Sequence, residues 1–172
     1  MTGDEELLNA LVRQAQLGDD TAFAALVAAR HRQAYQTAYA ILHSPRDAEE
    51  VTQDAFLKVF RKLHTLKEPS AFSAWLTTIV TRLAIDHMRS QKRHQAEPIE
   101  NVAEIPEREN DPTLRTVIEE ALAQLSPDHR AILLLRERDG YEYTEIARIL
   151  GVPIGTVKSR LAYAKQALRK FL

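Results

Sequence analysis

The stretch that decides the fold spans residues 143–161 and reads YTEIARILGVPIGTVKSRL. Gly151 lies at its centre and permits a tight turn between two short helices, because glycine adopts left-handed backbone conformations without steric cost. Thr144 suits the cap of the first helix, and Pro153 suits the first turn of the second. The inward positions expected on the first helix are Ile146, Ala147 and Leu150. This arrangement predicts a helix-turn-helix.

The second helix of this motif has a basic outer face. From position 153 to 172 the chain has five basic and no acidic residues. A DNA major groove admits an α-helix, lysine can read guanine edges, and flanking cations release counterions from the backbone. The pattern favours a DNA recognition helix, and the alternative is a solvated helix whose cations complement its own dipole. The expected buried stripe is Val157, Leu161, Ala164 and Leu168, and the expected outer positions are Thr156, Lys158, Ser159, Ala162, Tyr163, Lys165 and Arg169.

Composition narrows the class of protein. The 172 residues, 45% of them hydrophobic, suffice for one medium domain or two small ones. No cysteine is present, which excludes a disulfide framework, a thiolate metal site and a Cys nucleophile. The sequence has no uninterrupted apolar run of about 18 residues and an acidic N-terminus, so we expect a soluble, cytoplasmic protein without membrane insertion.

Helix-forming residues dominate, and no segment alternates with period two, so we expect an all-α fold. The expected helices before the motif span about 5–17, 20–42, 45–63, 71–92, 114–125 and 127–138. Their expected caps and breaks are Gly18, Asp19 or Asp20, Ser44 with Pro45, Ser70, Ser126 with Pro127, and Asp139 with Gly140.

A change in composition divides the chain into two small helical domains. Residues 95–112 contain three prolines, six acidic residues and one basic residue, with no amphipathic period. Such a segment is typical of a flexible linker. We therefore expect domains over residues 1–94 and 113–172. The acidity of the linker suits either mimicry of nucleic acid or simple solubility.

The helix expected over residues 45–63 carries a polar stripe. The stripe is acidic at its start and basic at its end, which complements the helix dipole. It is therefore either a solvated, self-stabilising face or a binding surface. The stripe consists of Asp47, Glu50, Asp54, Lys58 and Arg61, and the expected apolar face opposite it of Val51, Phe56, Val59 and Phe60.

Two stretches of the first half, together with the helix-turn-helix, resemble one family. Residues 47–61 read DAEEVTQDAFLKVFR, and residues 72–76 read FSAWL. The latter are followed by AIDHMR at 84–89 and by Lys92 and Arg93. These stretches resemble the second region of bacterial sigma factors, and the helix-turn-helix resembles the fourth. With only these two regions, the chain resembles the extracytoplasmic-function class over about residues 18–172.

The resemblance implies partners and site residues. Asp47, Glu50, Gln53 and Asp54 would bind the clamp helices of the largest subunit of core RNA polymerase, whose second-subunit flap is a further expected partner. The −10 element would be bound by the loop over residues 64–70, which captures a flipped base, and by cations that follow phosphates. The implied −10 residues are His64, Lys67, Ser70, Arg82, Arg89, Lys92 and Arg93. Trp75 is either a base platform or, as we favour, part of the core.

The fourth region would read the −35 element of promoter DNA. The implied base-proximal residues are Lys158, Ser159, Ala162 and Tyr163, the implied phosphate contacts are Arg160 and Lys165, and Thr156 is a further implied −35 residue. An anti-sigma factor is the implied regulatory partner. No cofactor, metal site or catalytic residue is expected, and the chain is not expected to be an enzyme.

Three other functions compete with this interpretation. A helix-turn-helix regulator that is not a polymerase subunit would explain only the second half. A metal-dependent hydrolase would use Asp47, Glu49, Glu50 and Asp54, but the six histidines are scattered and no HExxH occurs. A structural helical adaptor would leave the paired resemblances unexplained.

Overall fold

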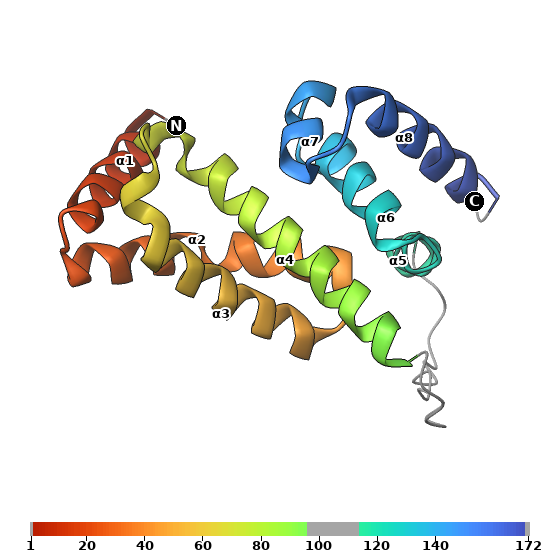
Figure 1. The fold of residues 1–172 in the computed structure, drawn as a ribbon, viewed down its shortest axis with the longest axis horizontal. Helices are drawn as coiled ribbons and strands as arrows, with labels where there is room; N and C mark the ends of the chain where they lie inside the picture. The colour runs from red at the N-terminus through yellow and green to blue at the C-terminus, as the bar shows by residue number, and fades with distance from the viewer. Residues whose placement is uncertain (1, 96–113, 171–172) are drawn as a thin grey trace. The chain divides into compact units, whose positions relative to one another are not determined.

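Every element is helical in the part of the chain that the computed structural model describes, residues 2–95 and 114–170 (Figure 1). The predicted all-α class is thereby confirmed. The chain divides into two compact units, residues 1–84 and 85–172, and the division falls inside α4 (Phe72–Gln95). The predicted linker lies, from position 96 onward, outside the described residues, so the predicted domain limits stay a prediction.

The N-terminal unit begins with helices whose ends follow local sequence signals. Gly18 has a φ of +91°, and Asp19 caps α2 by accepting a 2.9 Å hydrogen bond from the backbone N–H of Ala22. Ser44 caps α3 in the same way, by accepting from the N–H of Asp47. The caps predicted at these positions are confirmed. The bounds are α1 (Thr2–Gln16), α2 (Asp20–Leu42), α3 (Pro45–Lys62), two 3-10 turns (Leu63–Thr65 and Pro69–Ala71), and α4.

The core of this unit forms where α2 packs against α1 and α3. Burial of each large apolar side chain contributes roughly 1.5–3 kcal/mol to folding. Phe60, predicted to lie on the buried face of α3, is 59% exposed, so that assignment is wrong. The largest fully buried apolar side chains of the unit are Phe72, Leu26, Ile41, Val12, Val59 and Val80.

The C-terminal unit contains the predicted helix-turn-helix. Gly151 ends α7 in the left-handed conformation at φ +66°, and Gly140 has φ +74° in the preceding turn. Val157, Leu161 and Ala164 of α8 are buried as predicted, together with Ile149 of α7, which was not among the expected inward positions. The bounds are α5 (Leu114–Ala123), α6 (Pro127–Leu133) with a π-helical turn (Leu134–Arg138), α7 (Tyr143–Leu150) and α8 (Ile154–Leu168).

Three predicted helix starts are wrong in detail. Ser70 lies inside the 3-10 turn that precedes α4 and is therefore not the cap of that helix. Glu142, rather than Thr144, is the N-cap of α7, and the Glu145 carboxylate accepts a 2.7 Å hydrogen bond from its N–H. Pro153 is the N-cap residue of α8 and lies just before the first turn.

Arg130 joins α5 to α6 from inside the C-terminal unit. Its guanidinium is almost fully buried and donates hydrogen bonds of 2.8, 2.9 and 3.1 Å to the carbonyls of Leu122, Ala123 and Leu125. Burial lowers the pKa of Arg130 to about 10, so the group stays charged at neutral pH. Because the last carbonyls of a helix lack partners within it, this side chain satisfies the end of α5.

We expect Arg130→Met to destabilise the C-terminal unit by about 3 kcal/mol, since three carbonyls at the end of α5 lose a charged donor. Hydrogen exchange of the full chain, followed in peptides from α5 and α6, measures the effect. Arg138→Met is the matched control, because Arg138 forms an ion pair at the surface with Asp139 and such pairs contribute about 0–1 kcal/mol. Equal protection in both variants would contradict the anchoring role.

Candidate functional site

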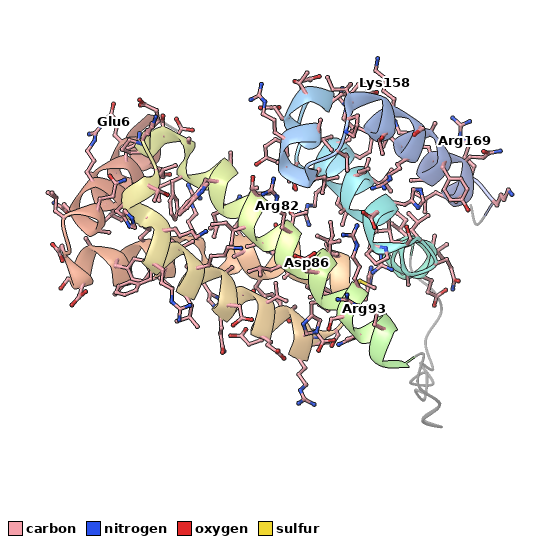
Figure 2. The ribbon with its side chains drawn as sticks, viewed as in Figure 1. Glu6, Arg82, Asp86, Arg93, Lys158 and Arg169 are labelled. Atoms are coloured by element: carbon pink, nitrogen blue, oxygen red, sulfur yellow. The ribbon has the colours of Figure 1, made fainter. Side chains whose placement is uncertain are left out.

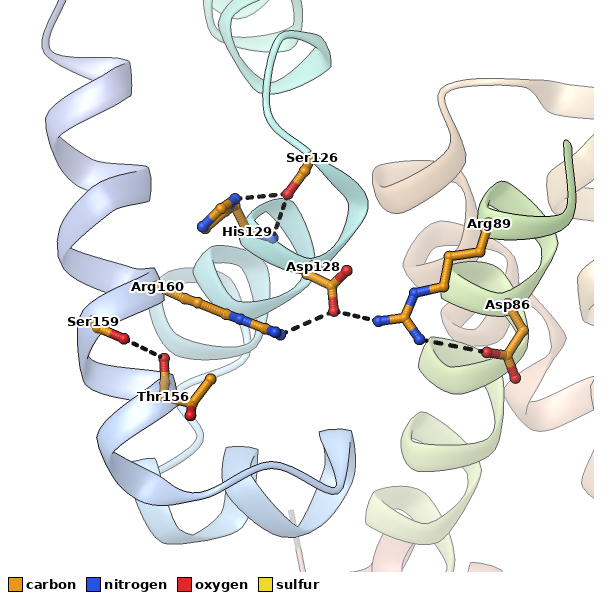
Figure 3. Close-up of polar contacts among 8 residues, drawn as sticks. All are labelled: Asp86, Arg89, Ser126, Asp128, His129, Thr156, Ser159 and Arg160. Atoms are coloured by element: carbon orange, nitrogen blue, oxygen red, sulfur yellow. Dashed lines mark hydrogen bonds and ion pairs between the residues drawn. The ribbon is translucent and has the colours of Figure 1, made fainter. Parts of the chain in front are cut away.

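The outward face of α8 contains one cation without an acidic partner among the residues that the structure describes. Lys158 is exposed, and Figure 2 shows its side chain pointing away from the other helices of the unit. Ser159 and Ala162 are exposed on the same helix. The Ser159 hydroxyl donates a 3.1 Å hydrogen bond to the carbonyl of Thr156, within the first turns of α8 (Figure 3).

Other predicted −35 residues contact α6 and its π-helical extension. Nη1 of Arg160 lies 3.0 Å from Oδ1 of Asp128, and both side chains are largely shielded from solvent. Nζ of Lys165 lies 2.7 Å from Oε1 of Glu137, but this pair is about half-exposed. Two of the cations predicted to contact phosphate are therefore already paired within the unit.

Tyr163 is the aromatic residue of α8. It is 58% exposed, and its centroid lies 4.6 Å from the ring of His129. Nδ1 of His129 lies 2.6 Å from Oγ of Ser126. Burial and the nearby charge of Arg160 lower the pKa of His129, so the neutral ring is favoured beside Tyr163 at neutral pH.

The predicted polymerase-binding residues lie along α3. Glu50, Gln53 and Asp54 are exposed, and we call them the acidic face. Asp47 is partly buried in the first turn of the helix. Leu57 lies one turn beyond Asp54 on the same side of α3, and its side chain is 54% exposed. The sequence did not reveal this exposure, because the neighbouring apolar residues of α3 belong to the core.

An exposed aromatic ring, missed from the sequence, lies near the end of α3. Phe60 packs edge-on against Phe23 of α2, with ring centroids 5.1 Å apart. The two rings line a cavity of about 230 Å³ beside the turn between α1 and α2.

The predicted −10 residues lie on the loop before α4 and on α4 itself. His64, Lys67 and Ser70 are exposed on that loop. Figure 2 shows Arg82 and Arg93 spaced along α4, and both are exposed. The remaining predicted residues on this helix are Arg89 and Lys92. Nη2 of Arg89 donates to Oδ1 of Asp128 at 2.7 Å, and its Nη1 lies 4.0 Å from Oδ1 of Asp86 (Figure 3). The side chain of Lys92 is outside the described part.

Trp75 occupies an intermediate environment. It is partly buried, and its ring lies 6.3 Å from that of Phe72, which is fully buried. The ring therefore lies beside the core at Phe72 and is partly exposed to solvent. Both interpretations of Trp75 therefore stay open.

Comparison with known proteins identifies the family of the chain. The profile of sigma-70 region 2 matches residues 26–94, and that of sigma-70 region 4 matches residues 115–168. The chain is 34% identical over 169 residues to the ECF RNA polymerase sigma factor SigM of Mycobacterium tuberculosis, covering 98% of this chain and 84% of SigM. The chain belongs to the ECF class of sigma-70 factors.

Other relatives of this sigma factor agree. The ECF RNA polymerase sigma-E factor of Escherichia coli K12 is 33% identical, over 92% of this chain and 90% of that protein. Among solved structures, the sigma factor RpoE in complex with the anti-sigma factor NepR from Bartonella quintana has a TM-score of 0.67 at 28% identity. That match covers 87% of this chain and 95% of RpoE.

The remaining structural tests concern membranes and metals. No helix in residues 2–95 or 114–170 of this sigma factor is long and apolar enough to cross a membrane. Over the same described ranges, no group of three or more His, Asp or Glu side chains is arranged to bind a metal ion.

A glutamine that precedes the region 2 match holds the start of the loop over residues 64–70, which we call the −10 loop after its predicted role. Nε2 of Gln16, at the end of α1, donates to the carbonyls of Leu63 and Leu66 at 3.0 and 2.7 Å. The side chain therefore connects the start of the loop to α1. Sequence reasoning missed it, because the partners are 47 and 50 residues away.

We expect Gln16→Leu to loosen this loop, since two carbonyls lose their donor. The measurement is hydrogen exchange of the full sigma factor, followed in peptides that cover residues 63–72, where exchange should be about tenfold faster. Gln14→Leu is the matched control, because Gln14 is exposed on the same helix. Identical exchange in the two variants would show that the loop does not depend on Gln16.

Proposed function

We propose that this sigma factor binds core RNA polymerase through α3, directs it to promoters by contacts with separate −35 and −10 elements, and helps to melt the −10 element. The observation that carries the proposal is the pairing, in one chain, of a region 2 match containing the acidic face with a region 4 match containing the exposed face of α8. Bond formation belongs to the polymerase, so the chain supplies no catalytic group.

The acidic face supports the polymerase contact. Glu50, Gln53 and Asp54 lie on one exposed side of α3, opposite the buried Val51 and Val59. Oppositely charged surfaces increase association rates and set orientation. The proposed partner is the pair of clamp helices of the largest subunit, with the second-subunit flap contacting region 4.

Two surfaces support promoter contacts. Lys158, Ser159, Ala162 and Tyr163 are exposed on α8, which suits a helix in the major groove at the −35 element. The −10 loop and the exposed arginines of α4 suit single-stranded DNA, which needs cations along its backbone. The proposed −10 residues are His64, Lys67, Ser70, Arg82, Arg89, Lys92 and Arg93.

The proposal includes regulation by an anti-sigma factor. Its support is the structural similarity to RpoE, which was solved in complex with the anti-sigma factor NepR. Such a partner would compete with the polymerase for the sigma factor.

Transcription from a promoter library tests the function. We expect purified core polymerase to start at defined sites only when this chain is added, with sequence preferences at −35 and −10. The same reactions distinguish a regulator that is not a polymerase subunit, because such a regulator would bind the DNA without core polymerase and would not create start sites. Absence of factor-dependent start sites would overturn the proposal.

We expect Lys158→Ala to weaken or redirect the −35 preference by about tenfold while core binding is unchanged, since Lys158 is proposed to contact DNA alone. Promoter competition with reconstituted holoenzyme measures the preference, and fluorescence titration measures core binding. Lys170→Ala removes an exposed cation beyond α8 and serves as the control. Loss of core binding in Lys158→Ala would instead indicate a structural role.

We expect Asp54→Lys to reduce affinity for core polymerase about tenfold at ~50 mM salt and less at ~500 mM, because salt screens charges at a surface. Titration of labelled sigma factor with core polymerase measures both values. Glu6→Lys makes the same charge change at an exposed position of α1, outside both family matches, and should have little effect. An affinity that is equal for Asp54→Lys and the unmodified protein would exclude the assigned interface.

A further inference from the structure

Two consecutive residues in the first turn of α6 contact two residues on successive turns of α8. Asp128 forms ion pairs with Arg160 at 3.0 Å and with Arg89 of α4 at 2.7 Å, and His129 contacts the ring of Tyr163 (Figure 3 shows the two ion pairs). Positions 160 and 163 are three residues apart and lie on the same side of a helix. The first turn of α6 therefore touches α8 along the edge of its exposed face.

This turn of α6 is itself well anchored. Ser126 is its N-cap, and its Oγ lies 2.6 Å from Nδ1 of His129 and accepts from the His129 N–H at 3.4 Å. Pro127 is buried at the first helical position, and Arg130 bonds the end of α5. The backbone of this turn is thus held in place, so its side chains can position side chains on α8.

The ion pair differs in environment from the other pair on α8. The side chains of Arg160 and Asp128 are 31% and 23% exposed, whereas those of Lys165 and Glu137 are 47% and 52% exposed. Asp128 is in the first turn of α6, where a negative charge is stabilised by the helix dipole. Arg160 is therefore the less suited of the two cations to exchange its partner for a phosphate.

We propose that the first turn of α6 positions the recognition face of α8: Asp128 orients α8 through Arg160, and His129 supports the ring of Tyr163. Arg160 is then a positioning residue for −35 recognition rather than a phosphate contact, which revises its role implied by resemblance. This inference rests on the proposed −35 function of α8.

Salt dependence distinguishes the two roles of Arg160. Each phosphate contact contributes roughly 0.9 to the slope of log K against log salt. We expect Arg160→Met to leave the slope of holoenzyme binding to promoter DNA unchanged, and the control Lys165→Met, at the other implied phosphate contact, to reduce it by about one. A reduction of about one for Arg160→Met would overturn the proposal.

Discrimination between intact and scrambled −35 elements tests positioning directly. We expect Asp128→Asn and Arg160→Met each to reduce the discrimination ratio about fivefold, and the double variant to be no worse than either, because paired residues are non-additive. Asp128→Glu retains the charge and should restore most of the ratio. Additive losses, or unchanged ratios, would overturn the proposal.

A second set of variants tests the contact between His129 and Tyr163 in the same assay, independently of the ion pair. We expect His129→Ala to reduce discrimination about threefold in the unmodified protein and not at all when Tyr163→Ala is already present. Hydrogen exchange of α5–α8 shows whether each variant folds. If Asp128→Asn unfolds, the proposal is tested by Asp128→Glu and by the His129→Ala and Tyr163→Ala variants. An equal effect of His129→Ala in both backgrounds would overturn the role of His129.

The unmodified holoenzyme separates failure of this inference from failure of the proposed function. If it shows no preference for the −35 element, both the proposed −35 function and the inference fall. If it shows the preference and the α6 variants retain it, only the inference falls.

Discussion

An α-helix of about 3.6 residues per turn can direct only part of its surface inward, and this constraint decides which charges of the protein face solvent. On α8, the fully buried Val157 and the nearly buried Leu161 fix the rotation of the helix. With that rotation, Lys158 and Ser159 have to face outward. On α3 the burial of Val59 has the same consequence for Asp54. Each proposed interface is therefore the solvent-facing complement of a core stripe.

The sequence predicted those parts of the structure that depend on local interactions. Ser126, Ser44 and Asp19 are caps whose partners lie three residues away, so the signal is contained in a short window. Thr144 failed as a cap because Glu142, a less common N-cap type, competes for the same helix start and has Glu145 three residues later.

What could not be predicted depends on contacts between distant residues. Gln16 reaches carbonyls 47 and 50 positions away, and Arg160 pairs with a residue 32 positions away. Neither side chain differs in type from an ordinary surface residue, so only the packing of the helices reveals its role. The exposure of Phe60 has a similar origin, because it depends on how far α2 covers α3, and periodicity along α3 alone contains no such information.

The charges on α8 have unequal value for a nucleic-acid surface, although counting them from the sequence treats them alike. An exposed pair such as Lys165 with Glu137 contributes little to stability, so Lys165 can change partners at small cost. A shielded pair costs more to break, because one charge is left poorly solvated. The number of cations on a helix therefore overstates how many can bind phosphates. On α8, a cation is less available when it lies next to an acidic side chain of α6.

The protonation state of His129 follows from the same arrangement. Burial is the largest cause of its lowered pKa and the Arg160 charge the second, while Asp128 raises the pKa by less. Because the folded-state pKa lies below the ordinary value of 6.5, the stability contributed by the neutral ring is present above that value and is lost as pH falls through the folded-state pKa. A protonated ring would add a positive charge next to Arg160 and compete with it for Asp128. The arrangement of His129 between the Tyr163 ring and the ion pair of Arg160 with Asp128 therefore favours the neutral ring.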